Sequence, residues 1–270
     1  MVVQHNLSAM NTNRQMGVVT SALQKSTEKL SSGYKINRAG DDAAGLSISE
    51  KMRSQIRGLN KASDNAQDGI SLIQVAEGAL NETHSILQRM NELATQAAND
   101  TNTSVDRQSI KDEIEQLNAE LDRISTTTQF NKQDLLTGKF SGKLQVGALE
   151  GQTMDLKIST AVSSTGLKVK DIKVSTNENA GKAMKSIQDA IESVSKQRSK
   201  LGAIQNRLEN TINNLDTNAE NTQAAESRIR DTDMADEMVQ YSKNNILSQA
   251  GQSMLAQANQ QTQGVLSLLQ

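Results

Sequence analysis

A stripe of apolar and small residues, placed in alternating steps of three and four, runs through the last third of the chain. This spacing repeats every 3.5 residues over six heptads and is typical of a coiled-coil seam. Polar residues in a seam lower stability but can fix the register of the paired helices. The stripe consists of Ile187, Ala190, Val194, Gln197, Leu201, Ile204, Leu208, Thr211, Leu215, Asn218, Thr222, Ala225 and Ile229.

Two further stripes with helical spacing lie earlier, at residues 56–97 and 110–124. We expect residues 43–98 to form one helix of about 84 Å, with Asp41 or Asp42 capping its start. Neither long helix can bury its stripe alone, so they are expected to lie side by side. The chain has no proline, which removes the strongest helix breaker, and its 1% aromatic content favours a thin aliphatic core.

The middle of the chain changes character between residues 130 and 176, where glycine and β-branched residues increase and the heptads stop. Residues 144–146 and 154–158 alternate as strands do, and Gly151 can supply a positive φ in the turn between them. The predicted fold is therefore mainly α: an elongated antiparallel helical bundle or coiled coil, with a small β-hairpin region at the rod tip, at about 132–176.

The two ends of the chain are unusually poor in charge. Residues 244–270 carry no charged side chain, and His5 is the one titratable side chain in residues 1–13. Residues 1–40 contain five basic residues and one acidic residue, whereas residues 231–270 contain one lysine and four acidic residues. Since termini are usually solvated, we expect these ends to be buried against each other and against copies of themselves. The predicted polymerisation core comprises Val3, Leu7, Met10, Val239, Ile246, Leu247, Met254, Val265 and Leu268.

The sequence carries no pattern that predicts catalysis, a cofactor or a metal site. His5 and His84 are the only histidines, cysteine is absent, and the common zinc, phosphate-loop, serine-hydrolase and dinucleotide motifs are missing. A formal charge of −2 gives no basic field for nucleic acid. No apolar run approaches about 18 residues, so membrane insertion is not expected, and a cleaved secretion signal is not expected either.

Several long blocks of the sequence resemble bacterial flagellin, and together they cover about residues 1–131 and 177–270. The family often has a proline shortly before its final apolar residues, where this chain has Gln261-Thr262-Gln263. The blocks that carry the resemblance are Leu30–Asn37, Asp41–Ile48, Gln67–Ile70, Gln74–Leu80, Gln197–Leu208, Ala225–Asp231 and Val265–Leu269.

The resemblance implies a U-shaped structural subunit that is not an enzyme and self-assembles into the flagellar filament for motility. Residues 1–42 and 232–270 would form the inner filament core, called D0. Residues 43–231 would form the rod, called D1, with its hairpin insert. Because only about 132–176 separate the two arms, the chain would be a short form without the outer domains D2 and D3. Flagellins leave the cell through the flagellar type III apparatus, so the expected location is the secreted, extracellular filament.

The resemblance also implies partners. These are copies of the chain itself, an export chaperone at the C-terminal helix, the filament cap and hook-junction proteins, and Toll-like receptor 5. The family's receptor site maps onto Arg89, Leu93 and Glu113. Arg89 and Leu93 are four residues apart and are expected to share one helical face. Alternatively, Arg89 and Glu113 would only bridge two helices or make contacts between subunits.

Three other interpretations remain open from sequence alone. A cytoplasmic coiled-coil scaffold would explain the heptads but not the uncharged ends. A hook–filament junction protein resembles flagellin at both termini but is poorer in the 197–208 and 225–231 blocks. An enzyme inserted in the middle lacks both length and motif.

Overall fold

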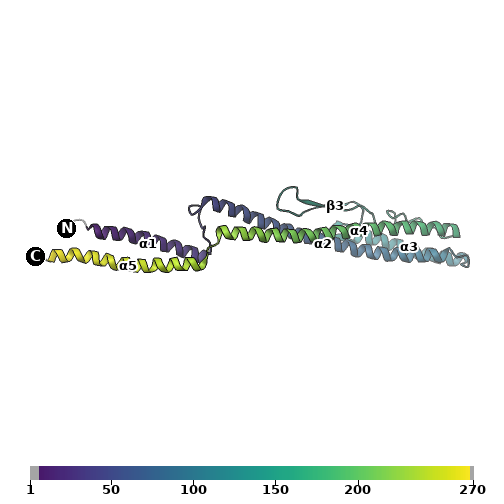
Figure 1. The fold of residues 1–270 in the computed structure, drawn as a ribbon. Helices are drawn as coiled ribbons and strands as arrows, with labels where there is room; N and C mark the ends of the chain where they lie inside the picture. Colours follow the sequence, from purple (N-terminus) through teal and green to yellow (C-terminus); the bar gives the residue numbers. More distant parts are fainter. Residues whose placement is uncertain (1–5, 268–270) are drawn as a thin grey trace. The chain divides into compact units, whose positions relative to one another are not determined.

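The computed structural model describes residues 6–267, with side chains as far as Gln261. The chain forms two compact units: a terminal unit, residues 1–54 and 221–270, and a rod unit, residues 55–220 (Figure 1). The described elements are α1 (Leu7–Ser32), α2 (Ala43–Ala97), α3 (Ser104–Thr127), β1 (Gln129–Phe130), β2 (Gln133–Asp134), β3 (Phe140–Gln145), β4 (Thr153–Ile158), α4 (Asn177–Arg230) and α5 (Met234–Ser267).

The single long helix predicted for residues 43–98 is α2, and its start shows which aspartate caps it. Asp42 accepts a hydrogen bond from the Gly45 N–H at 2.9 Å. Asp41 instead accepts hydrogen bonds from the backbone N–H groups of Asn37 and Arg38, at 3.2 and 3.0 Å. The two neighbouring carboxylates therefore have separate tasks: one begins the helix and the other holds the turn before it.

Most of the predicted α2 stripe is buried in the rod unit. The exceptions are Ile56 and Ile70, which are half-buried. The stripe is wider than a simple seam, because Ala62, Leu72 and Leu93 are buried as well. Such width is expected of a helix that packs against more than one neighbour.

The α4 stripe follows the predicted positions through Leu215 and then shifts by one residue. Asn218, predicted to lie in the seam, is exposed, and Ala219 is buried in its place. The steps from Thr211 to Leu215 to Ala219 are both four residues, which is the pattern of a stutter in a coiled coil. Here Leu215 and Ala219 form a small separate core with Leu59 and Ala62 of α2.

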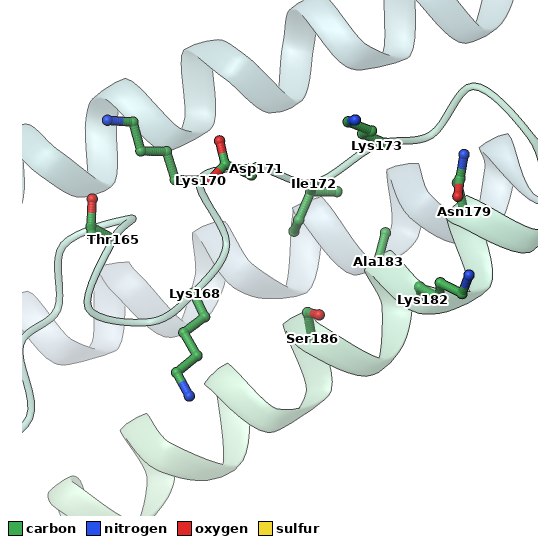
Figure 2. Close-up of a pocket in the computed structure, with 10 residues that line it drawn as sticks. All are labelled: Thr165, Lys168, Lys170, Asp171, Ile172, Lys173, Asn179, Lys182, Ala183 and Ser186. Carbon is green, nitrogen blue, oxygen red and sulfur yellow. The ribbon is translucent and has the colours of Figure 1, made fainter.

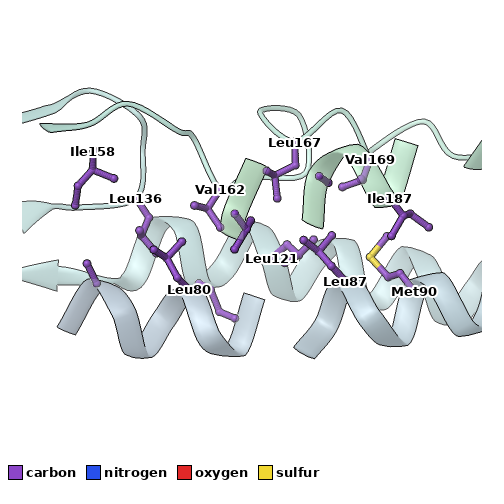
Figure 3. Packing of buried hydrophobic residues seen from close by; sticks show 14 of the residues in the cluster. Leu80, Leu87, Met90, Leu121, Leu136, Ile158, Val162, Leu167, Val169 and Ile187 are labelled. Atoms are coloured by element: carbon purple, nitrogen blue, oxygen red, sulfur yellow. The ribbon is translucent and has the colours of Figure 1, made fainter. Parts of the chain in front are cut away.

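The main rod core lies where α2, α3, α4 and the segment after β2 meet (Figure 3). A capping box begins α3: the Thr103 hydroxyl accepts from the Asp106 N–H, and Asp106 accepts from the Thr103 N–H at 2.9 Å. The helices contribute Leu80, Leu87, Met90, Leu121 and Ile187 to this core, and the loop segments contribute Leu136, Val162, Leu167 and Val169.

Two antiparallel hairpins, β1–β2 and β3–β4, follow α3. In β4 exposed and buried residues alternate as predicted, and Gly151 in the turn has φ +83. The β3–β4 hairpin lies along the side of α2 rather than beyond the helix ends. Asn65 donates to the Gln145 carbonyl at 3.1 Å, and an added Cβ at Gly58 would lie 2.8 Å from the Ala148 Cβ. The reason is length: α3 is too short to cover this part of the α2 stripe, and the hairpin covers it.

In the terminal unit, α1 and α5 run side by side (Figure 1). Gly33 ends α1 in the left-handed conformation, with φ +75, and its carbonyl accepts from the Thr232 N–H at 3.0 Å. The Arg230 guanidinium stacks over the Tyr34 ring, 4.7 Å from its centroid. These contacts bind the end of α1 to the segment that leads into α5.

The predicted fold class, mainly α with a small antiparallel β region, is confirmed. The two compact units divide at residues 54/55 and 220/221, near the limit of the rod core at Leu59 and Ala219. The predicted D0 and D1 boundaries lie nearby, after residues 42 and 231, and stay predictions.

Candidate interaction surfaces

The first candidate surface is the outward side of the helix pair in the terminal unit. On α1, Leu7, Met10 and Val18 are 71%, 64% and 62% exposed. At about 100° per residue their positions fall within roughly 80° of one another on the helix. Val18 is not among the core residues predicted from sequence. Its eight-residue step from Met10 is a helical signal that could have identified it.

A matching stripe runs along α5. At about 100° per residue its members fall within an arc of roughly 100°, and each is at least 44% exposed. Between Val239 and Met254, Lys243 is the charged residue within the arc, and Asp236 lies on the same face in the first turn of α5. Single exposed apolar residues are ordinary, but continuous apolar stripes mark an interaction surface. The α5 stripe consists of Val239, Ile246, Leu247 and Met254.

A groove of about 450 Å³ lies between the two helices. Met16 and Val19 of α1 line it from one side, and Leu247, Gly251 and Met254 of α5 from the other. Leu247 and Met254 thus belong both to the groove and to the exposed stripe, so the apolar surface continues from one to the other.

Polar contacts hold α1 against α5 near both ends of α1. At the start, the Asn6 amide donates to the Ala258 carbonyl at 2.9 Å. Near the end, Lys29 pairs with Glu237 at 3.3 Å, and the Glu237 side chain is 13% exposed. The opposite net charges predicted for the two ends therefore meet in an ion pair. The predicted core residues Val3 and Leu268 lie outside the described residues, as does the side chain of Val265.

The second candidate surface lies on the rod, where α2 and α3 are adjacent. Arg89 donates from Nε to the Glu113 carboxylate at 3.1 Å, and its second terminal nitrogen lies 3.0 Å from the same oxygen. Arg89 also donates to Glu92 at 3.2 Å. The hydrogen bond with Glu113 raises the pKa of Arg89 further above its ordinary value, with Glu92 adding to the effect. Glu92 was missed by the sequence analysis, although its three-residue step from Arg89 could have revealed it.

Leu93 does not share the exposure of Arg89. Its side chain is 2% exposed and lies in the rod core, whereas the Arg89 side chain is 53% exposed. The four-residue step predicts that both residues share one helical face. The α2 stripe is wide enough for Leu93 to turn inward toward α3. Leu93 is therefore part of the rod core in the single chain, and its assignment to the receptor site stays a prediction.

A third feature is an open pocket of about 410 Å³ between the 165–173 loop and the first turns of α4 (Figure 2). Lys168, Lys170, Lys173 and Lys182 are among its lining residues. Their ammonium groups do not converge: Figure 2 shows Lys168 and Lys170 pointing to opposite sides of the loop. Lys182 is already paired with Glu178 at 2.7 Å. The pocket is therefore positively charged, but its lysines do not converge on a common position where a ligand could bind.

The described residues include neither a metal-binding cluster nor a helix that could span a membrane. No group of three histidine or carboxylate side chains there could hold a metal ion. None of the helices in the described part of the chain has an apolar stretch long enough for a bilayer.

A helical rod with hairpins on its side, joined to a pair of terminal helices with uncovered apolar faces, defines a class of helical structural protein. Comparison with known families identifies which one. The model of the bacterial flagellin N-terminal helical region matches residues 3–141, and that of the C-terminal helical region matches residues 184–269. The chain belongs to the bacterial flagellin family.

Relatives match along the whole chain. A flagellin of Halalkalibacterium halodurans is 57% identical over 273 residues, covering 100% of both chains. A flagellar filament 31.3 kDa core protein of Treponema maltophilum is 51% identical over 287 residues, again covering 100% of both. The crystal structure of Bacillus cereus flagellin matches with a TM-score of 0.51 and 32% identity, over 60% of this chain and 94% of that one.

Family membership decides among the interpretations left open by the sequence. The flagellin resemblance is confirmed, and the scaffold and junction-protein alternatives are set aside by the full-length match. Flagellins are structural proteins, so the prediction that the chain is not an enzyme is confirmed by its family. The chain is a structural component of the flagellar filament.

Proposed function

We propose that the chain polymerises with copies of itself into the flagellar filament through its terminal unit. The observation that carries this is the pair of uncovered apolar stripes, one on α1 and one on α5. Apolar surface left in water costs about 25 cal/mol per Å² relative to burial. Copies that cover each other's stripes recover this free energy at every step of growth.

A heterologous contact of this kind, repeated without closing into a ring, gives a helical filament. The stripes on α1 and α5 suit such a contact. They differ in length and composition, so a stripe on one copy does not have to pack against the same stripe on the next copy. Under this proposal residues 1–42 and 232–270 form D0, and residues 43–231 form D1. A chain with only two small hairpins between α3 and α4 has no D2 or D3.

Polymerisation in vitro tests the proposal directly. Purified chain, seeded with sheared filament fragments, should form filaments that are visible by electron microscopy and sediment above a critical concentration. A chain that stays monodisperse with seeds at high concentration would contradict the proposed role of the terminal unit.

Delivery to the filament is the next part of the proposal. The subunit leaves the cell through the flagellar type III apparatus and reaches the extracellular filament, where cap and hook-junction proteins adjoin it. The exposed stripe of Val239, Ile246 and Leu247 gives an export chaperone an apolar surface to shield on α5. Loss of the chain from culture supernatants when the export apparatus is deleted tests the route, and copurification with α5 tests the chaperone.

The free subunit is also proposed to be a ligand of Toll-like receptor 5. The supporting observation is Arg89, an exposed guanidinium held by two carboxylates, Glu113 and Glu92. Fixed arginines of this kind are frequent hot spots in protein interfaces, and bonds that fix the fork lower the entropy lost on binding. Binding of the purified monomer to the receptor ectodomain, with Arg89→Ala as the variant, tests this role.

A further inference from the structure

We infer that Met10 and Met254 are modification sites at which a peroxide blocks assembly of the free subunit by converting a thioether into a sulfoxide. This inference rests on the proposed polymerisation through the terminal unit. It adds a redox sensitivity that the family assignment does not contain.

Methionine exposure differs between the two units. In the rod, Met90 and Met154 are core residues, 0% and 7% exposed. The large exposed apolar side chains of the terminal unit include four methionines, and these four side chains are accessible to a dissolved oxidant. The four are Met10, Met234, Met238 and Met254, which are 64%, 48%, 49% and 57% exposed.

Two of these four lie within the assembly stripes. Met10 shares the outer face of α1 with Leu7 and Val18, and Met254 belongs to the α5 stripe and also lines the groove. Met234 and Met238 begin α5 and are turned roughly 80° or more away from the α5 stripe. The four side chains therefore form two pairs of similar exposure and different position.

The reaction is an oxygen transfer. The thioether sulfur attacks one peroxide oxygen, the O–O bond breaks and an S–O bond forms. The sulfur loses two electrons and the peroxide is reduced. The proton on the transferred oxygen moves to the departing hydroxide, so that one thioether and one hydrogen peroxide give one sulfoxide and one water. Sulfoxide formation turns a flexible apolar side chain into a polar one and is reversed by sulfoxide reductases.

In the proposed assembly, a sulfoxide at Met10 or Met254 would be buried among the apolar side chains of its stripe, where burying an added polar group is costly. Each oxidised side chain should raise the critical concentration for assembly about tenfold. Sulfoxides at Met234 and Met238 should have little effect, since these side chains lie outside both stripes. In the finished filament Met10 and Met254 should be protected.

The experiment treats full-length monomer with hydrogen peroxide, removes the peroxide with catalase, and measures seeded assembly by sedimentation. Peptide mass spectrometry reports sulfoxide at each methionine. Met10→Leu/Met254→Leu should assemble equally well before and after treatment. The matched control, Met234→Leu/Met238→Leu, should lose assembly as the parent does. A sulfoxide reductase should restore assembly of the treated parent.

Two results would overturn the inference: assembly of parent fully oxidised at Met10 and Met254 at its original critical concentration, or equal peroxide sensitivity of the two double variants. If the leucine variants assemble poorly even without peroxide, the inference is tested instead by how strongly assembly protects each methionine from oxidation. Met10 and Met254 must then be oxidised at least about tenfold more slowly in filaments than in monomer. Failure of untreated parent to polymerise would instead contradict the proposed filament role.

Discussion

Asp122 on α3 holds Ser164 by two hydrogen bonds. Its carboxylate accepts from the Ser164 backbone N–H at 2.8 Å and from the Ser164 hydroxyl at 2.9 Å. Ser164 is 1% exposed and lies in the loop between β4 and α4. This loop carries Val162, Leu167 and Val169 into the rod core, so one carboxylate holds a large part of the core segment in place.

Replacing Asp122 by alanine should destabilise the rod by about 2 kcal/mol, because a buried backbone N–H and a buried hydroxyl lose their acceptor. Chemical denaturation followed by far-UV circular dichroism measures the loss. Glu115→Ala on the same helix is the control. Its exposed pair with Lys111 should be worth less than about 1 kcal/mol. Equal losses of stability in the two variants would show that the Asp122–Ser164 hydrogen bonds contribute no more than an exposed ion pair.

Two glycines of α2 should respond in opposite directions to alanine. A Cβ at Gly58 would lie 2.8 Å from the Ala148 Cβ, whereas one at Gly78 has nothing within 4 Å. Gly58→Ala should displace the hairpin and destabilise the rod by about 1–2 kcal/mol, overpacking outweighing helix propensity. Gly78→Ala should stabilise it by about 0.5–1 kcal/mol. Thermal denaturation of the two variants measures both, and a shift of the same sign would contradict the packing of the hairpin against α2.

The capping box of α3 should weaken in acid. Hydrogen bonds from the Thr103 hydroxyl, and then from its backbone N–H, lower the pKa of Asp106 below its ordinary 3.8. A lowered folded-state pKa means that the contribution to stability is present above 3.8 and is lost as the pH falls through the lowered value. Thr103→Val should move the Asp106 pKa up toward 3.8 in a carbon-13 NMR titration. Thr95→Val, whose hydroxyl serves its own helix, should leave the Asp106 pKa unchanged.

Leu247→Asp should abolish polymerisation without unfolding the rod. Leu247 is 44% exposed in the single chain and lines the groove, so a partner subunit would bury the new charge at a cost of several kcal/mol. Sedimentation after seeding measures assembly, and circular dichroism confirms the helices. Leu247→Met keeps the apolar surface and should still polymerise. Normal filaments from Leu247→Asp would mean that this part of α5 faces solvent in the assembly.

Arg89→Ala should weaken monomer binding to the Toll-like receptor 5 ectodomain by about 2 kcal/mol, the usual scale for a hot spot. Surface plasmon resonance with purified monomer measures it. Glu113→Gln should weaken binding less, since an amide still accepts one hydrogen bond from the guanidinium. Unchanged affinity for Arg89→Ala would leave Arg89 as a bridge between α2 and α3 only.

Leu93 provides a check on that experiment. Because its side chain is buried, Leu93→Ala should destabilise the rod by about 2–5 kcal/mol. Any loss of receptor binding should then follow the loss of folded rod. Arg89→Ala should change affinity at unchanged stability.

The helices could be predicted from sequence because their stripes are long and repeat regularly. The α4 positions from Ile187 to Leu215 are buried or half-buried as predicted. The shift to Ala219 could not be predicted, because the heptad repeat assigns Asn218 to the seam. In the structure Ala219 is buried instead and packs in the small core with Leu59 and Ala62. The position of the hairpin was missed for a different reason: it depends on where α3 ends relative to α2, which is a relation between elements.

The surfaces were predictable to a similar degree. Charge-poor ends with helical spacing identified Leu7, Met10 and the α5 stripe, because such composition is rare at termini. The spacing of Arg89 and Leu93 was not enough, because a four-residue step leaves the two positions about 40° apart. On a helix with a wide buried stripe, that angle is enough to separate an exposed residue from a core residue.

The stutter at Leu215 and Ala219 has a mechanical consequence. Heptad packing winds two helices around each other with a left-handed twist, and an inserted four-residue step locally removes that winding. Around Leu59 and Ala62 the helices are therefore locally straight, and small side chains occupy two of the four core positions. With this winding absent and only four buried residues in its core, we expect this stretch to twist more easily under torque than the larger core around Leu80 and Ile187.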